Sequence, residues 1–387
     1  MHYYQPLLLT PGPTPVPDEI MSQIQLPMIG HRSSDFEVIA EDAYSGLKPI
    51  FGAQNDVLIL TSSGTSVLEA SILNIANLED HIVIIVSGAF GNRFKQIAET
   101  YYKNIHVYDV SWGEAVNVNS FLDFLKSLNV KVTAIFTQFC ETSTGVLHPI
   151  HVLGQEIKSY DSDIYFIVDG VSCIGAVDVD LVKDHIDVLV SGSQKAIMLP
   201  PGLAFVAYST RAKSRFKEVT TPRFYLDLNK YIDSSTKHST PFTPNVSLFR
   251  GVNAYVDLVK HEGLNHVIQR HYIIRDALRH ALKALDLDVL VKKDEVASPT
   301  VTAFIPNSKD ELTIIKNQLK SRFNITIAGG QGHLKGEILR IGHMGKVSPF
   351  DILSVVSALE LILTEYRNSN YIGTGVSKFM EVIQHES

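Results

Sequence analysis

The chain has 387 residues, 45% of them hydrophobic, and its formal net charge is −7. A chain of this length can bury a sizeable core and commonly divides into two domains. The negative charge gives no basic field for a phosphate backbone, which argues against nucleic acid as a partner and favours small molecules. The two cysteines cannot build a disulfide framework, and neither a membrane span nor the basic segment of a signal peptide is present. We therefore expect a cytoplasmic protein with no membrane contact.

Short apolar segments rich in β-branched residues alternate with amphipathic stretches through the first half of the chain. This pattern predicts strands at residues 56–60, 82–87, 105–110, 132–138, 164–169, 188–191 and 203–207. Most of these segments are too apolar to have one face in water. The expected fold class is therefore α/β, with a largely parallel or mixed sheet covered by helices on both sides.

A second, smaller α+β domain is expected to begin near residue 260. Residues 208–250 show little periodicity, and the pattern becomes helical at 252–261 and 267–287. Further on, it predicts strands at 300–305 and 337–341 and helices at 310–322 and 350–366. We expect an N-terminal arm over residues 1–18, a large domain over 19–258, a small C-terminal domain over 259–372 and a tail over 373–387.

Lys195 and Asp169 each follow an apolar predicted strand. The carboxyl ends of strands in an open α/β sheet form the edge where ligands bind. A lysine held there in a partly apolar pocket has a lowered pKa and can form an imine, and an aspartate there can keep the pyridine nitrogen of pyridoxal 5′-phosphate protonated. Taken singly, Lys195 is typical of a solvated surface lysine, and Asp169 is equally typical of a turn before Gly170.

Residues 61–65, Thr-Ser-Ser-Gly-Thr, lie between a predicted strand and a predicted helix. We expect the helix to begin with a capping box formed by Ser66 and Glu69. Hydroxyl groups, a glycine and the positive end of a helix suit an anionic phosphate, although helix capping alone explains part of the pattern. The segment lacks the lysine of a P-loop, and residues 88–91 do not match the dinucleotide-binding motif.

Trp112 and Arg340 are two further candidates. Trp112 follows the strand predicted at 105–110, where an indole can stack on a flat cofactor ring, although a core position is the commoner use of tryptophan. Arg340 offers a planar fork that matches a substrate carboxylate, whereas an isolated arginine more often forms a structural ion pair.

Together, these segments resemble the class V aminotransferases of fold-type I, in particular the alanine–glyoxylate and serine–pyruvate aminotransferase group. The resemblance spans nearly the whole chain, and its segments occur in family order. The matching segments lie at residues 10–13, 63–69, 112–113, 141–145, 168–172, 192–195, 200–202, 224–227, 243–248 and 340–345.

The resemblance implies a fold-type I transferase that uses pyridoxal 5′-phosphate and acts as a homodimer with shared active sites. Lys195 is then the Schiff-base lysine and proton carrier, Asp169 the partner of the pyridine nitrogen, and Arg340 the clamp for the substrate α-carboxylate. The other residues implied at the cofactor are Ser63, Gly64, Thr65 and Gln194 at its phosphate, Trp112 on its ring, Ser143 at its phenolic edge or the substrate, Val171 beside Asp169, and Thr240 and Thr243 at the neighbouring subunit's phosphate.

The chain departs from the family pattern at two points. Phe139 and Cys140 stand where many relatives carry a polar residue before Glu141, and Thr240 stands where some carry tyrosine. Arg32 belongs to a His-Arg pair that is similar to one in bacterial relatives; it either contacts a substrate or ties down the N-terminal arm, and we favour the structural role.

The implied activity is a ping-pong transamination from alanine or serine to glyoxylate or pyruvate. Phosphoserine, aminoethylphosphonate and ureidoglycine remain alternative substrates. A lyase related to the cysteine desulfurases is a second alternative, and it requires a nucleophilic cysteine on a mobile loop. A non-catalytic, partner-binding relative is the third, and the presence of Lys195, Asp169 and Arg340 together argues against it.

Overall fold

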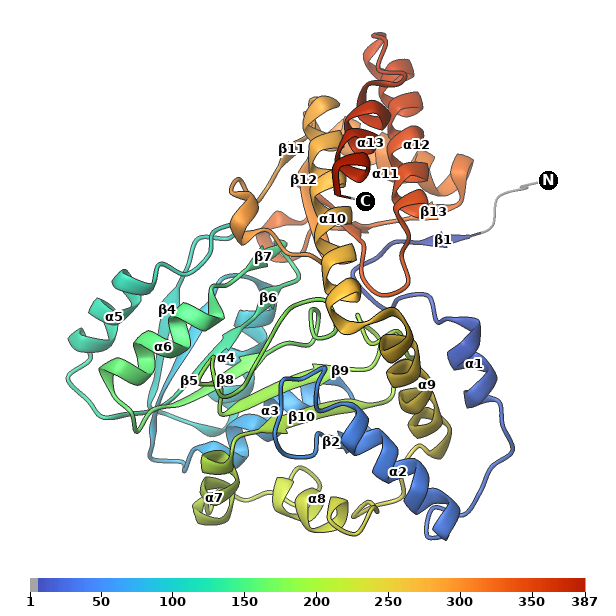
Figure 1. Cartoon of the computed structure of the whole chain (residues 1–387). Helices are drawn as coiled ribbons and strands as arrows, with labels where there is room; N and C mark the ends of the chain where they lie inside the picture. The colour runs from blue at the N-terminus through green and yellow to red at the C-terminus, as the bar shows by residue number, and fades with distance from the viewer. Residues whose placement is uncertain (1–5, 387) are drawn as a thin grey trace.

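A seven-stranded sheet forms the centre of the computed structural model, which describes residues 6–386 (Figure 1). All seven strands predicted for the large domain are present in this sheet, in the order β2-β10-β9-β8-β5-β3-β4. Their bounds are β2 (Leu58–Leu60), β3 (His81–Val86), β4 (Ile105–Asp109), β5 (Val132–Gln138), β8 (Tyr165–Asp169), β9 (Val188–Gly192) and β10 (Ala204–Tyr208). Strands β9, β8, β5, β3 and β4 run parallel, whereas β10 is antiparallel to both of its neighbours. The sheet is therefore mixed and mostly parallel, as expected.

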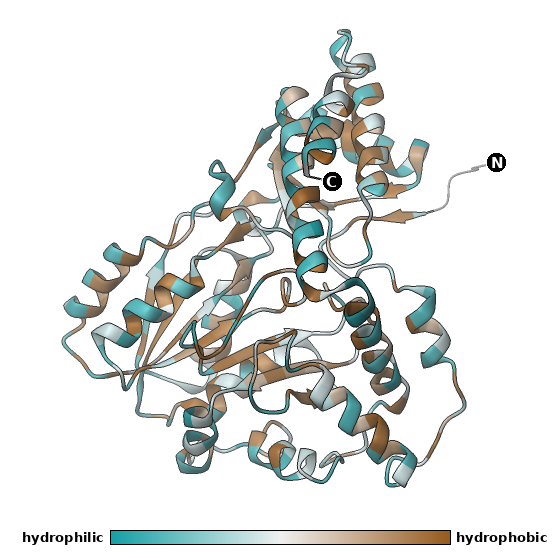
Figure 2. Ribbon diagram, viewed as in Figure 1, coloured by the Kyte–Doolittle hydropathy of each residue, from teal (hydrophilic) through white to brown (hydrophobic). Residues whose placement is uncertain are grey.

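Helices cover both faces of this sheet, because the strands are apolar on both sides. One face packs against α2 (Ser34–Gly46), α5 (Val118–Ser127), α6 (Ile150–Tyr160) and α9 (Val246–Glu262). The opposite face packs against α3 (Gly64–Ile75), α4 (Ala89–Tyr101), α7 (Thr210–Glu218) and α8 (Leu228–Ser235). Most strands of the sheet are brown in Figure 2, which shows this apolar layer between the helices.

The smaller α+β domain begins with the long helix α10 (Leu264–Ala284). Its antiparallel sheet contains β11 (Asp288–Val289), β12 (Val301–Ile305), β15 (Leu339–Gly342) and β14 (Ala328–Gly329), in that order. The helices α11 (Lys309–Phe323), α12 (Pro349–Arg367) and α13 (Thr374–Glu386) complete the domain. The strands and helices predicted here are therefore present.

Both ends of the described chain belong to the small domain. Strand β1 (Leu7–Leu8) pairs in parallel with β13 (Ile325–Thr326), and helix α1 (Asp18–Ile24) follows the arm. The expected tail contains α13, which packs on α10 and buries Phe379 completely. Residues 6–18 of the expected arm and 373–386 of the expected tail are thus built into the fold; residues 1–5 and 387 lie outside the described residues.

The start of α3 differs from the expected capping box. The helix begins at Gly64 with Ser63 at the N-cap position, and the Ser66 hydroxyl donates to the Ser63 carbonyl at 2.8 Å. Glu69 instead accepts a hydrogen bond from the Tyr101 hydroxyl. The prediction placed the cap three residues too late, because a Ser-x-x-Glu pattern occurs equally well within a first turn.

None of the helices within residues 6–386 combines the length and the apolar character that a membrane span requires.

Candidate active site

Lys195 lies just beyond the carboxyl end of β9 and is buried. Its Nζ donates to the backbone carbonyl of Pro11, which belongs to the N-terminal arm. Burial, and then the positive charge of Arg340, lower the pKa of Lys195 to about 8. A neutral amine is therefore accessible near physiological pH, which an imine-forming lysine requires.

Asp169 ends the neighbouring parallel strand β8 and is also buried. Its Oδ1 accepts a hydrogen bond from the Val171 N–H at 2.9 Å. Burial raises the pKa of Asp169 to about 7, although this hydrogen bond and the charge of Lys195 act in the opposite direction. The two residues singled out from the sequence thus meet at one edge of the sheet, and each alters the titration of the other.

The amino end of α3 lies close to both residues and leaves hydrogen-bonding groups free. Ser63, at the N-cap, makes no side-chain capping bond, and its side chain and that of Thr65 are exposed. Gly64 approaches Gly192 so closely that a Cβ on Gly192 would lie 3.6 Å from the Gly64 Cα and 3.2 Å from the Gln194 Oε1. Such a Cβ would also meet Val171 at 3.5 Å. The helix dipole, the hydroxyl groups and Gln194 therefore lie close together.

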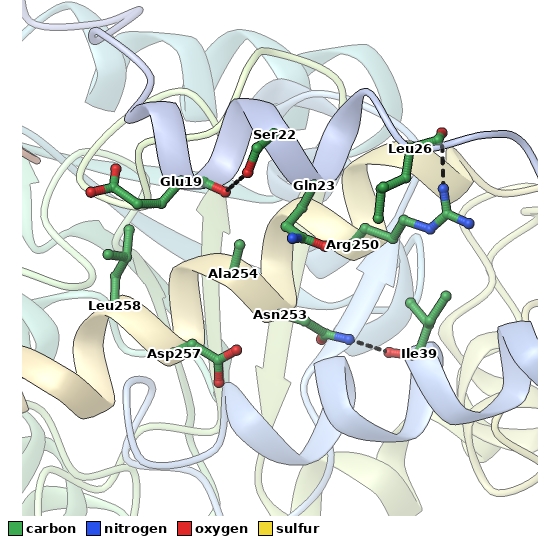
Figure 3. Close-up of a pocket in the computed structure, with 10 residues that line it drawn as sticks. All are labelled: Glu19, Ser22, Gln23, Leu26, Ile39, Arg250, Asn253, Ala254, Asp257 and Leu258. Atoms are coloured by element: carbon green, nitrogen blue, oxygen red, sulfur yellow. Dashed lines mark hydrogen bonds between the residues drawn. The ribbon is translucent and has the colours of Figure 1, made fainter.

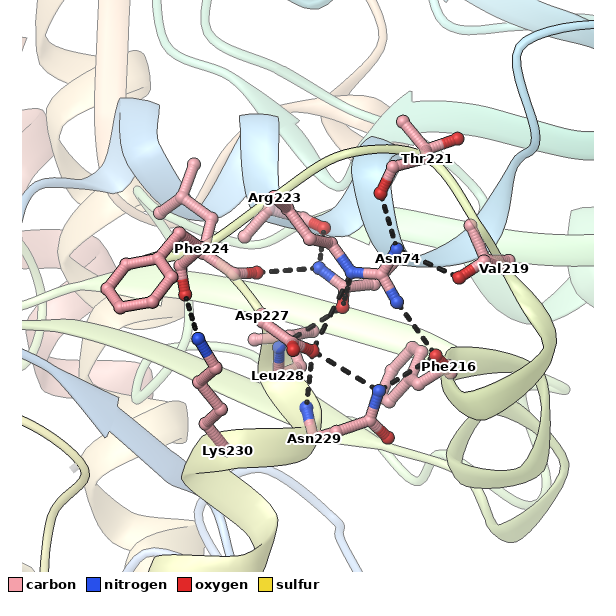
Figure 4. Close-up of polar contacts among 12 residues, drawn as sticks. Asn74, Phe216, Val219, Thr221, Arg223, Phe224, Asp227, Leu228, Asn229 and Lys230 are labelled. Atoms are coloured by element: carbon pink, nitrogen blue, oxygen red, sulfur yellow. Dashed lines mark hydrogen bonds and ion pairs between the residues drawn. The ribbon is translucent and has the colours of Figure 1, made fainter.

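A network of polar contacts around Asn74, at the opposite, carboxyl end of α3, fixes the segment that leads into α8 (Figure 4). The Asn74 Oδ1 accepts from the Arg223 Nε at 2.8 Å, while its Nδ2 donates to the Leu226 carbonyl at 2.7 Å. Asp227 caps α8 by accepting from the Asn229 N–H at 3.2 Å. The same segment carries Tyr225, whose hydroxyl donates to the Thr61 carbonyl at 2.9 Å and thereby braces the loop before α3.

Thr240 and Thr243 occupy different environments. Thr240 is buried, and its hydroxyl donates to the Phe242 carbonyl at 2.8 Å, so this hydroxyl is used within its own turn. Thr243 is exposed. Arg32 donates to the Ser239 hydroxyl at 2.8 Å and to the Thr240 carbonyl at 2.6 Å, so its guanidinium is bonded to the segment between α8 and α9.

Glu141 and Ser143 form a buried cluster with the amino end of α4. The Glu141 carboxylate accepts from the N–H groups of Phe90 and Gly91 at 3.1 and 3.0 Å, and from the Ser143 hydroxyl at 2.5 Å. The Ser143 oxygen accepts in turn from the Ala89 N–H at 2.9 Å. Burial raises the pKa of Glu141, and the anion is compensated by the helix end, where N–H groups lack partners within the helix.

Phe90 is a site residue that the sequence interpretation missed. It lies in the first turn of α4, the helix that follows β3, and its N–H donates to the Glu141 carboxylate. The guanidinium of Arg93 lies 5.0 Å from the centroid of its ring. The available signal was an aromatic residue separated from a buried strand by three small residues. The sequence interpretation considered residues 88–91 only as a dinucleotide motif.

Trp112 is not brought to Lys195 by the structure. Its partly exposed ring packs against His333 of the small domain, with ring centroids 4.2 Å apart. A Cβ on Gly332 would lie 2.8 Å from the indole. The indole therefore belongs to a contact between the two domains.

Arg340 is buried on β15, where the small domain meets the site. Its Nε donates to the Gly329 carbonyl at 2.9 Å and its Nη1 to the Thr142 carbonyl at 2.8 Å. Within residues 6–386, the Nη2 of Arg340 donates no hydrogen bond and the side chain forms no ion pair. Arg340 is therefore not part of a structural salt bridge. Burial lowers the pKa of Arg340, which nevertheless stays protonated as arginines do.

Both cysteines are buried, Cys140 beside the small domain and Cys173 within the large one. The Cys140 Sγ donates to the Ser298 hydroxyl at 2.8 Å, and burial raises the pKa of both thiols. Neither has the exposure and lowered pKa of a nucleophilic cysteine, which disfavours the lyase alternative. No group of three or more potential metal ligands occurs among the described residues.

A separate hollow lies between α1, α2 and α9 (Figure 3). Its volume is about 680 Å³, and it contains neither Lys195 nor Asp169. Arg250 at its rim donates to the Leu26 and Pro27 carbonyls. These contacts serve to hold α1 against α9 and bring no catalytic group together.

A family model for class V aminotransferases matches residues 7–345. The chain belongs to this family. This aminotransferase is 40% identical to a Synechococcus protein described as the small subunit of a soluble hydrogenase, over 97% of this chain and 98% of the relative. It is 30% identical to a serine–glyoxylate aminotransferase of Hyphomicrobium methylovorum, over 97% and 94% of the two chains.

Among solved structures, the class V aminotransferase fold of this chain is similar to pyridoxamine–pyruvate aminotransferase from Mesorhizobium loti. The TM-score is 0.93 at 25% sequence identity, covering 100% of this chain and 99% of the other. The chain therefore has the fold-type I architecture and is a transferase enzyme.

Proposed function

We propose that this aminotransferase binds pyridoxal 5′-phosphate at Lys195 and moves the amino group of alanine or serine to glyoxylate or pyruvate. The observation that carries the proposal is the juxtaposition of Lys195, with a pKa lowered to about 8, and the buried Asp169 at adjacent strand ends. The glyoxylate and pyruvate in the names of similar proteins support the choice of acceptor.

The residues present fit the cofactor. The uncapped amino end of α3 offers Ser63, Gly64 and Thr65 to a phosphate, together with the Gln194 side chain. Asp169 supplies the carboxylate for the pyridine nitrogen, and Val171 lies between these two groups. When bound, the cofactor supplies an electron-accepting ring for the charge left on the substrate α-carbon.

The remaining chemistry belongs to side chains of the protein. Arg340 binds the substrate α-carboxylate through its free Nη2 and so orients the bond from Cα to hydrogen. Lys195, released as a neutral amine, accepts and returns the Cα proton. The Ser143 hydroxyl already donates its proton to Glu141, so its oxygen can only accept a further hydrogen bond at the reacting edge. The buried surroundings exclude water. We propose two half-reactions in ping-pong order, so that the first oxo acid leaves before the second binds.

Phe90 rather than Trp112 is proposed as the aromatic ring beside the cofactor. Glu141 holds the Phe90 backbone at 3.1 Å and Ser143 at 2.5 Å, so the three residues form one rigid unit at the lysine edge of the sheet. Trp112 is engaged with His333 in the contact between the domains.

We further propose a cytoplasmic homodimer in which Thr243 reaches the partner's phosphate. Phe224 is 72% exposed beside Phe242, with ring centroids 5.8 Å apart, near the loop that precedes α3. An exposed aromatic surface of this kind suits a second copy of the chain. Replacing Phe224 with glutamate is expected to produce monomers in light scattering. Thr240 is the weaker candidate, because its hydroxyl is already bonded.

Visible spectroscopy of the purified protein with pyridoxal 5′-phosphate tests the proposed function. Alanine or serine should abolish the absorption band of the lysine-bound cofactor, and glyoxylate should restore it. Lys195→Ala should lose this response. If the variant kept both the colour and its response to amino acids, Lys195 would not be the attachment site.

A further inference from the structure

Gln138 ends β5 at the carboxyl edge of the large sheet and is completely buried. Within residues 6–386, neither the Nε2 nor the Oε1 of its side chain has a hydrogen-bond partner. Burying an unpaired amide is costly, so nearly all buried polar groups in folded proteins have partners. The amide therefore marks a place where a partner is expected, and the roles proposed above do not use it.

Gln138 lies beside Asp169. The two residues are paired in register across the parallel strands β5 and β8. Side chains at such paired positions point to the same face of a sheet, and neighbouring strands are only about 4.8 Å apart. The first turn of α4 covers Gln138 on this face, because a Cβ on Gly91 would lie 2.7 Å from the Gln138 Oε1. The amide is thus enclosed between the Asp169 strand end and α4.

Of the two buried carboxylates at this edge, one has an oxygen free. Both oxygens of Glu141 accept hydrogen bonds from the first turn of α4 or from Ser143. Asp169 accepts from the Val171 N–H through Oδ1, whereas its Oδ2 accepts from no group within residues 6–386. Asp169 is therefore the carboxylate that is available to the Gln138 Nε2.

The ionised form of Asp169 is the form that benefits from a donor. Burial raises the pKa of Asp169 to about 7, and the charge of Glu141 acts in the same direction. The Val171 N–H and the charges of Lys195 and Arg93 act against them. The cofactor requires a carboxylate at its ring nitrogen, and an amide N–H bonded to a carboxylate favours the charged form. A further donor at Asp169 would thus serve the proposed chemistry.

We propose that Gln138 is a positioning residue, whose Nε2 donates a hydrogen bond to the Asp169 Oδ2 and keeps this carboxylate charged and directed at the pyridine nitrogen of the cofactor. The inference rests on the proposed function. A rotation of the Gln138 side chain closes the bond, because both side chains start from neighbouring strands on one face. A carboxylate oxygen has two lone pairs, so Oδ2 can accept from Gln138 and from the ring nitrogen together.

Cofactor affinity tests the proposal with a variant that keeps the side-chain length and removes the amide, Gln138→Met. It should weaken binding of pyridoxal 5′-phosphate by about 10- to 100-fold, the range for loss of a hydrogen bond to a charged group, and binding of the deaza analogue, in which carbon replaces the ring nitrogen, by less than about threefold. Gln155→Met removes an exposed amide from α6 and should change neither affinity. Equal weakening for both compounds would indicate a merely structural role and overturn the proposal, as would no weakening for either.

Titration of Asp169 in the protein without added cofactor separates this inference from the proposed function. With isotope-labelled aspartate, nuclear magnetic resonance should give a higher pKa for the Asp169 carboxyl in Gln138→Met than in the unaltered protein, because the carboxylate has lost a donor. This result would stand even if the protein took up no pyridoxal 5′-phosphate, in which case only the proposed function would fail. The same pKa in both proteins would overturn the role of Gln138.

A measurement on the unaltered side chain remains decisive if Gln138→Met does not fold. The side-chain NH₂ signals of isotope-labelled Gln138 should move downfield as Asp169 ionises, and this movement should be absent in Asp169→Asn. An amide signal that does not respond to the ionisation of Asp169 would show that Gln138 has another partner, and would refute the proposal.

Discussion

The backbone carbonyl of Pro11 accepts a hydrogen bond from Nζ of Lys195, so the N-terminal arm closes directly over the reactive amine. The next residue, Gly12, has φ +91°, and a Cβ there would lie 2.7 Å from the same Nζ. Thr14 completes the contact, because its hydroxyl donates to the Lys195 carbonyl at 3.1 Å. The arm therefore sets the space available to the lysine.

Gly12→Ala is expected to abolish stable attachment of the cofactor, because the added methyl group would overlap the lysine side chain. Gly373→Ala is the matched control: its φ is +83°, but nothing lies within 4 Å of the place its methyl group would take, so it should cost only the backbone strain of about 1 kcal/mol. Absorbance of the bound cofactor and Tm measure the two effects. Normal cofactor uptake by Gly12→Ala would show that the arm moves aside freely.

The pH dependence of cofactor capture should respond in opposite directions to two substitutions. Only the neutral amine attacks the aldehyde, so the capture rate should rise with pH through the Lys195 pKa of about 8. Arg340 lowers this pKa and Asp169 raises it. Arg340→Met should therefore move the midpoint up and Asp169→Asn should move it down, each by roughly half a unit to one unit. Stopped-flow absorbance measures both, and shifts of the same sign would contradict this account.

Asp169→Asn should stabilise the protein without cofactor and destabilise it with cofactor. The folded pKa of about 7 lies above the ordinary value of 3.8, so the folded chain binds the extra proton between these values and loses stability as pH rises through them. At pH 8, the asparagine variant without cofactor should melt a few degrees above the unaltered protein, and at pH 4 the two should melt alike. With cofactor bound, the asparagine variant should melt below the unaltered protein, because the pyridine nitrogen of the cofactor has lost its carboxylate partner. A lower Tm at pH 8 in both forms would argue against a burial cost at Asp169.

Glu141→Gln should loosen the amino end of α4. The substitution removes the anion that accepts from Phe90, Gly91 and Ser143 and turns an NH₂ group toward backbone donors. We expect a loss of about 1–3 kcal/mol in the free energy of unfolding and a lower kcat. Glu99→Gln, at the exposed far end of the same helix, should change neither by a comparable amount. Denaturant unfolding measures the difference, and equal effects of the two substitutions would show that Glu141 is no anchor.

Much of the fold was predictable because it depends on local patterns. Strands that are buried on both faces consist of consecutive apolar residues, so the sequence predicted all seven strands of the large sheet. Lys195 and Asp169 were found for a related reason, since a polar residue that ends such a run must lie at the carboxyl edge of the sheet.

The missed features depend on partners distant in the sequence. The destination of Trp112 is set by His333 in the other domain, which no pattern around the tryptophan reveals. The anchoring of Phe90 by Glu141 likewise joins residues that lie 51 positions apart in the sequence. The C-terminal helix escaped prediction because its apolar face is short and gains stability only from packing on α10.

The pairing of β1 with β13 has a consequence for how the protein is made. Leu7 and Leu8 are synthesised more than 300 residues before their partners Ile325 and Thr326. The segment that covers Lys195 therefore cannot settle until the small domain around β13 has emerged from the ribosome. A nascent large domain can form its sheet earlier, but Lys195 stays uncovered until β13 is available.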